Sequence, residues 1–185
     1  MNLMHTTFAS ALEVLRGQNI DCLMVGGHVV NYYGYARLTG DLDFMMVITD
    51  VDAMIRAMRT AGFTSYSVDS LVLFFKKPEP AIRVDFIRID SKTFEKLMCS
   101  AITANIMGCQ VKIPSLDDLL AMKFFSYAQS PSYRGKDLQD IVWLSIENKL
   151  APEVVLRPLA LKYANETIYQ QVCAMLPQNT GRKPS

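Results

Sequence analysis

The chain has 185 residues, of which half are hydrophobic and a fifth are charged, with a net charge of +1. This composition is typical of one compact globular protein. The near-neutral charge gives no strong global field that would indicate nucleic acid or a membrane as partner. No apolar run reaches the roughly 18 residues of a membrane span, and no secretory signal is apparent. The four cysteines are scattered without a Cys-x-x-Cys pair, so we expect reduced thiols and a cytoplasmic location. The short apolar runs lead us to expect no membrane partner.

In chain order, hydrophobic periodicity predicts strands and helices that alternate at first and helices alone from Ser115 onward. The expected elements are helices at 7–17, 28–37 and 50–63 and strands at 20–27, 41–48, 70–77, 81–89 and 109–114. The 50–63 helix has a cap at Asp50 or Asp52 and a stop at Gly62. Strands 70–77 and 81–89 flank a Pro-Glu-Pro segment and are expected to form a hairpin. Residues 92–101 are ambiguous.

This order predicts an α+β protein in two parts. Residues 1–114 would form a small core of strands and helices, and residues 115–176 a helical segment packed on that core. The last segment, 177–185, is polar and rich in breaker residues, so we expect it to be disordered.

The first candidate site is the glycine pair Gly26-Gly27, which ends a predicted strand and opens a predicted helix. Backbone N–H groups left unpaired at such a turn, together with the helix dipole, favour an anion. Glycine also lets a phosphate approach the backbone without a Cβ in the way. The plain alternative is that the two glycines only make a tight turn.

A second candidate is the pair Asp41 and Asp43 in the strand 41–48. Alternate strand residues face one side, so the two carboxylates point together about 7 Å apart at Cα, while Leu42 and Phe44 face the core. A hard divalent cation such as Mg²⁺ would relieve their repulsion. The alternative is a solvated face, or partner Lys and Arg residues; Arg37 is the only base close in sequence.

Asp85 is the only acid of the strand 81–89. Taken alone it could simply pair with Arg83 or Arg88. If its strand lies beside the strand of the other two aspartates, however, three carboxylates meet. Three acids can hold two Mg²⁺ ions about 3.5–4 Å apart, with Mn²⁺ as the alternative metal, which is the arrangement used for in-line phosphoryl displacement.

The ordered set "VGG…RLTGDLDF" and "RVDFI" resembles the nucleotidyltransferase superfamily with the DNA polymerase β type of fold. Arg37-x-Thr39-x-Asp41-x-Asp43 is similar to its small bacterial branch, which includes the abortive-infection toxin nucleotidyltransferases. The resemblance covers about residues 20–145 and implies a mixed β-sheet with flanking helices, followed by a helical segment. One departure is Gly27, where many members have a serine that contacts phosphate.

The resemblance also implies roles for individual residues. It implies that Asp41, Asp43 and Asp85 are catalytic and hold the metal ions. The nucleotide-binding residues that it implies are Gly26, Gly27, Arg37, Thr39, Lys123 and Lys136.

The two lysines lie in "SLDDLLAMKFF" and "GKDLQDIVWL", stretches that are similar to the same branch and would place Lys136 and Asp137 near the pocket. For Lys123, on an apolar helix stripe, the alternative is a side chain that snorkels to solvent. For Lys136 the alternative is an i,i+4 pair with Asp140.

The expected function is Mg²⁺-dependent transfer of a nucleoside monophosphate from an NTP to an acceptor hydroxyl, with release of pyrophosphate. Two alternatives stay open: a toxin that uses this chemistry on tRNA or protein and has an antitoxin partner, and a non-catalytic nucleotide- or partner-binding module. The sequence leaves the roles of His28, Tyr133 and Arg134 unassigned, although the last two could gate the nucleotide from their loop.

Overall fold

The computed structural model describes residues 3–69, 71–78, 82–129 and 134–177. The chain divides into two compact units, the first formed by Met1–Tyr32 and Ala36–Asp118 and the second by Tyr33–Tyr35 and Leu119–Ser185. The tail expected to be disordered, 177–185, lies outside the described residues apart from Pro177, and so does Tyr133 in its loop.

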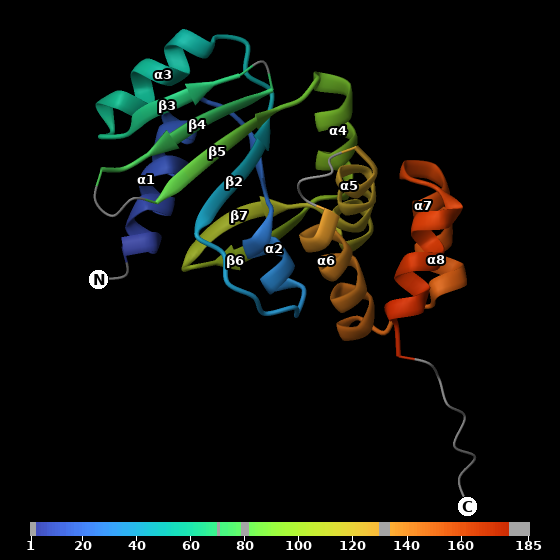
Figure 1. Cartoon of the computed structure of the whole chain (residues 1–185). Coiled ribbons are helices and arrows are strands. Elements are labelled where there is room, and N and C mark those ends of the chain that lie inside the picture. The colour runs from blue at the N-terminus through green and yellow to red at the C-terminus, as the bar shows by residue number, and fades with distance from the viewer. Residues whose placement is uncertain (1–2, 70, 79–81, 130–133, 178–185) are drawn as a thin grey trace, which may run out of the picture. The chain divides into compact units, whose positions relative to one another are not determined.

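The first unit has the mixed sheet and flanking helices of the predicted α+β class (Figure 1). Its elements are helices α1 (Leu3–Gly17), α2 (Gly27–Tyr32), α3 (Val51–Thr60) and α4 (Ser91–Ser100), and strands β1 (Cys22–Val25), β2 (Asp41–Met46), β3 (Thr64–Val68), β4 (Val72–Lys76), β5 (Arg83–Arg88), β6 (Ile102–Ile106) and β7 (Cys109–Ile113). The strand order is β1-β2-β5-β4-β3 in a five-stranded sheet, with β6 and β7 as a separate pair. Within the five-stranded sheet β2 and β5 pair in parallel, whereas β1–β2, β3–β4 and β4–β5 are antiparallel.

One face of the sheet is packed against α1. Phe44 on β2 is fully buried and stacks on Phe8 of α1, with ring centroids 5.9 Å apart. Leu42 and Met46, which alternate with it, are also fully buried. Because side chains alternate along a strand, the odd-numbered residues of β2 face the opposite side of the sheet. The predicted inward direction of Leu42 and Phe44 is therefore confirmed.

The predicted hairpin and the predicted cap of the 50–63 helix are confirmed, the predicted helix 28–37 ends earlier, at Tyr32, and two strands are new. Strands β4 and β5 form the expected antiparallel hairpin, and Asp50 caps α3 by accepting a hydrogen bond from Ala53 N at 2.8 Å. The ambiguous segment 92–101 is mostly helix α4, capped by Asp90. Strands β3 and β6 were not predicted, because Thr, Ser and Asn in these segments weaken the apolar alternation.

The second unit is helical. It comprises α5 (Leu116–Gln129), which begins in the first unit, α6 (Arg134–Glu147), the π-helical turn η2 (Pro152–Leu156), α7 (Arg157–Tyr163) and α8 (Glu166–Met175). Ser115 caps α5, since its Oγ accepts from Asp118 N at 3.2 Å. Residues 33–35 belong to this unit because Tyr35 stacks on Trp143, at 5.6 Å between ring centroids. In the described part of the chain, no helix is both long and apolar enough to cross a bilayer.

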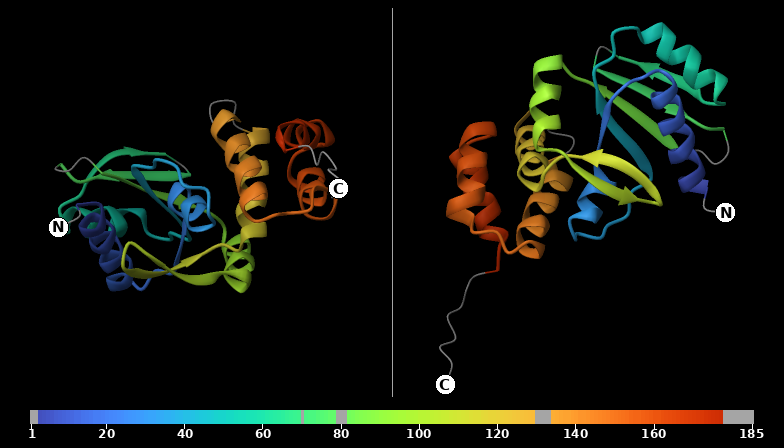
Figure 2. Two further views of the ribbon diagram at one scale, coloured as in Figure 1. Left: turned by 90° about the horizontal axis from the view of Figure 1, so that it is seen from below. Right: turned by 180° about the vertical axis from the view of Figure 1, so that it is seen from behind.

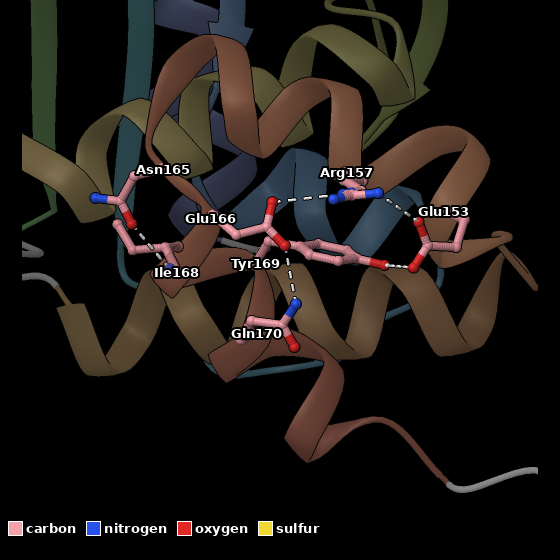
Figure 3. Close-up of polar contacts among 7 residues, drawn as sticks. All are labelled: Glu153, Arg157, Asn165, Glu166, Ile168, Tyr169 and Gln170. Carbon is pink, nitrogen blue, oxygen red and sulfur yellow. Dashed lines mark hydrogen bonds and ion pairs between the residues drawn. The ribbon is translucent and has the colours of Figure 1, made fainter.

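A polar network joins η2, α7 and α8 (Figure 3). Arg157 lies between two glutamates, with Nη1 at 3.4 Å from Glu153 and Nε at 3.4 Å from Glu166. The buried Tyr169 hydroxyl donates to Glu153 at 2.8 Å. Asn165 caps α8 by accepting from Ile168 N. These contacts fix the last two helices against the π-helical turn.

Candidate active site

The parallel pairing of β2 and β5 brings the three predicted acids to one face of the sheet. In register, Asp43 pairs with Asp85 and Asp41 pairs with Arg83. Paired residues on neighbouring strands lie about 4.8 Å apart and point to the same face. That face is opposite to the one that Phe44 presents to α1. The prediction that the strand of Asp85 lies beside the strand of the other two aspartates is therefore confirmed.

Arg83 bridges two of these carboxylates. Its Nη2 lies 2.6 Å from Asp41 Oδ2, and its Nε lies 3.0 Å from Asp85 Oδ1. The guanidinium also lies over the ring of Phe74, at 5.9 Å from the centroid. The alternative considered for Asp85, a pairing with Arg83, is thus what the structure shows. Arg37 is not the only base nearby, because the parallel register places Arg83 directly opposite Asp41.

Asp85 is the most deeply buried of the three acids. Its side chain is only 7% exposed, whereas that of Asp41 is 40% exposed. Burial raises the pKa of Asp85 from 3.8 to about 7, Arg83 works against this rise, and the nearby Asp43 and Asp41 add to it. The unloaded site therefore holds Asp85 partly protonated near neutral pH.

The two glycines make room for protein side chains. A Cβ at Gly26 would overlap with the Asp43 carboxylate, and Gly26 has a positive φ of 72°, which favours glycine. A Cβ at Gly27 would overlap with the Thr39 side chain and lie 3.1 Å from Arg37 Nη1. The β1–α2 turn thus lies directly against Asp43, Thr39 and Arg37. Close approach of these side chains is a reason for the glycines that the sequence did not suggest.

The segment that follows α2 is tied back to that helix. Asn31 accepts from Arg37 N through Oδ1 and donates to Arg37 O through Nδ2, both at 3.0 Å. This double hydrogen bond holds Arg37 beside the glycine turn, a role for Asn31 that no sequence motif indicates. Burial lowers the pKa of His28, Arg37 lowers it further and Asp41 opposes them, so His28 is neutral at pH 7.

The predicted lysines lie in the second unit. Lys123 Nζ is 2.8 Å from Asp137 and 2.8 Å from Asp140, and its side chain is only 13% exposed. The Lys123 side chain therefore does not extend to solvent, because its ammonium contacts two aspartates that lie one turn apart on α6. Lys136 is exposed on α6. The sequence suggested an Asp140 pair with Lys136, but the structure pairs Asp140 with Lys123.

The donor set suits a hard divalent cation, but the conformation is not that of a loaded site. Three carboxylates on one sheet face are the ligands that Mg²⁺ and Mn²⁺ prefer. Among the described residues, Asp85 Oδ1 is a buried oxygen that makes an ion pair but no hydrogen bond. Within those same ranges, no three His, Cys, Asp or Glu side chains are gathered closely enough to hold a metal ion. A cation would fit the chemistry of these residues after Arg83 has moved.

A family model described as "Nucleotidyl transferase AbiEii toxin, Type IV TA system" matches residues 11–169 of the chain. The match spans both units and includes all three acids and Lys123. No curated protein matches the sequence.

Several solved structures with a similar fold are nucleotidyltransferases or nucleotidyltransferase-like proteins. ANT(2'')-Ia, an antibiotic-resistance factor, aligns with a TM-score of 0.65 at 13% identity over 92% of this chain and 96% of that one. An antigenic nucleotidyltransferase-like protein from Paracoccidioides brasiliensis aligns with a TM-score of 0.56 at 20% identity, over 96% of each chain. The lincosamide adenylyltransferase LnuA aligns with a TM-score of 0.54 at 13% identity, over 78% of this chain and 97% of that one. At these identities the likeness shows the fold.

Proposed function

Because the chain belongs to the AbiEii family of nucleotidyl transferases, we propose that it moves a nucleoside monophosphate from an NTP to an acceptor hydroxyl in a Mg²⁺-dependent reaction. Pyrophosphate is the leaving group. The observation that carries this proposal is the register of β2 and β5, which puts Asp43 beside Asp85 and Asp41 two residues away on the same face. Family membership makes the non-catalytic module the weaker alternative.

The three carboxylates would share the work of the reaction. Asp41 and Asp43 would hold the divalent cations, and Asp85 would complete the set and help to deprotonate the acceptor hydroxyl. Mg²⁺, when bound, would neutralise the phosphate charge and activate the attacking oxygen. The buried position of Asp85 supports this role, because a carboxylate in a low-dielectric site attracts both cations and protons strongly.

The NTP phosphates would bind at the glycine turn and its neighbours. Arg37 lies beside Gly27, and Asn31 holds its backbone in place. The hydroxyl of Thr39, whose side chain lies against Gly27, can donate a hydrogen bond to a phosphate, which offsets the absent serine at position 27. The family resemblance supports Lys123 and Lys136 as further phosphate contacts. For Lys123 this role requires an exchange of its aspartate partners for phosphate.

The family description supports a biological role as the toxin of a toxin–antitoxin pair. We propose RNA or protein as the acceptor and a cognate antitoxin protein as the partner. The cysteines in the described part of the chain are all free thiols, which suits a reducing compartment such as the cytoplasm.

The test is transfer of label from each of the four NTPs, labelled at the α-phosphate, to total cellular RNA or total protein in the presence of Mg²⁺. The proposal predicts transfer from at least one NTP to one of the two pools, and loss of transfer in EDTA. Expression in a host cell should arrest growth, and the Asp43→Asn variant should not. Absence of transfer to either pool from every NTP would contradict the proposal.

A further inference from the structure

The Arg83 guanidinium contacts two of the three proposed metal ligands, so it holds a place that a divalent cation also needs. Its Nη2 and Nε lie 2.6 Å and 3.0 Å from Asp41 and Asp85. We propose that Arg83 is an internal counter-ion that neutralises the unloaded site and must leave both aspartates before a divalent cation can bind. This inference rests on the proposed function, because it concerns the same three carboxylates.

The register of the strands explains why one arginine reaches two acids. Arg83 pairs with Asp41 across the parallel strands, and Asp85 lies two residues further along β5 on the same face. A planar guanidinium can give one edge to the neighbouring strand and another to its own strand, which a lysine ammonium cannot do with the same geometry. The pattern Arg-x-Asp beside Asp-x-Asp thus builds a counter-ion into the sheet.

The position of Arg83 allows it to leave. Its side chain is 38% exposed, so its release from the two aspartates opens no cavity in the buried core. The guanidinium already lies over the Phe74 ring, at 5.9 Å from the centroid, and this cation–π contact does not depend on the two aspartates.

A counter-ion and a residue that positions the metal ligands predict opposite changes in metal affinity when Arg83 is removed. Removal of Arg83 frees two carboxylates and takes a positive charge away from the site, and both changes strengthen binding of a divalent cation. If Arg83 instead held the aspartates in the geometry that the metal needs, its removal would weaken binding. Metal affinity therefore separates a counter-ion from a positioning residue.

The experiment measures binding of Mn²⁺ alone, without nucleotide, from the electron paramagnetic resonance signal of free Mn²⁺. The variants are Arg83→Gln and the matched control Arg88→Gln, on the same strand about 16 Å away along its length. Release of a charge-assisted pair predicts that Arg83→Gln binds Mn²⁺ roughly tenfold more tightly than the wild type. Arg88→Gln should bind it like the wild type.

Two further variants keep the test decisive. Arg83→Lys keeps the charge but lacks the planar fork that contacts both strands, so it should bind Mn²⁺ with an intermediate affinity, and it serves if Arg83→Gln does not fold. Equal or weaker binding in the Arg83 variants overturns the counter-ion proposal while the metal site stands. Wild-type binding no stronger than that of Asp43→Asn overturns the metal site itself, and the counter-ion proposal with it.

Discussion

The buried carboxyl group of Asp85 should make the stability of the metal-free protein depend on pH. Its folded-state pKa of about 7 lies above the ordinary value of 3.8, so the folded protein keeps a proton that the unfolded chain releases. The stabilisation from this proton is complete below pH 3.8 and is lost as pH rises through 7. Between pH 4.5 and 7 the loss amounts to about 3 kcal/mol, at about 1.36 kcal/mol per pKa unit.

The perturbation that isolates this effect is Asp85→Asn, which keeps the shape of the side chain and cannot ionise. Urea unfolding in EDTA from pH 4.5 to 8 should show the variant gaining on the wild type by about 3 kcal/mol over that range. Asp21→Asn, at an exposed position before β1, is the control and should track the wild type. Parallel profiles for wild type and Asp85→Asn would refute the reasoning, because they would mean that burial does not penalise the charged form.

Three further predictions concern the turn and the helical unit. Gly26→Ala should lower the free energy of unfolding by at least roughly 2 kcal/mol and impair transfer, because its Cβ displaces Asp43. The control Gly40→Ala, whose Cβ would meet no described atom within 4 Å, should do neither. Equal effects of the two substitutions in urea titrations would count against the turn geometry. Lys123→Met leaves two buried aspartates without their lysine and should lower the free energy of unfolding by about 3 kcal/mol. A decrease within 0.5 kcal/mol, roughly that of a surface substitution, would argue that these ion pairs do not stabilise the fold. Tyr169→Phe removes the hydrogen bond to a glutamate on η2 and should cost about 1 kcal/mol with transfer unchanged, which calorimetry and the label assay can check together.

The elements around the carboxylates were predictable from the sequence because their signals are local. Alternation along 41–48 placed Leu42 and Phe44 in the core and the two aspartates on the opposite face, as β2 shows. The hairpin of β4 and β5 followed from two apolar runs around a proline-rich segment. The prediction that Asp85 lies near Asp41 and Asp43 came from the ordered motif set, and the register of β2 and β5 supplies its physical basis.

Apart from the Arg83–Asp85 pair within one strand, the partners of these residues were not predictable, because alternation gives the face of a side chain and not its neighbour on the next strand. Arg83 reaches Asp41 only through the parallel register. The pairing of Lys123 with Asp137 depends on how α5 meets α6, which periodicity within each helix does not determine. Likewise, the approach of Asp43 to Gly26 is a contact between distant segments, which the strand-to-helix glycine pattern does not reveal.

The most direct test of the account is the transfer activity of Asp43→Asn. The register places this residue beside Asp85 on the next strand, and the substitution removes one negative charge without a change in size. With an NTP labelled at the α-phosphate and Mg²⁺, the wild type should label its acceptor, whereas the variant, folded to the same extent by circular dichroism, should not. Full labelling by the variant would show that the three strand carboxylates do not carry out the transfer.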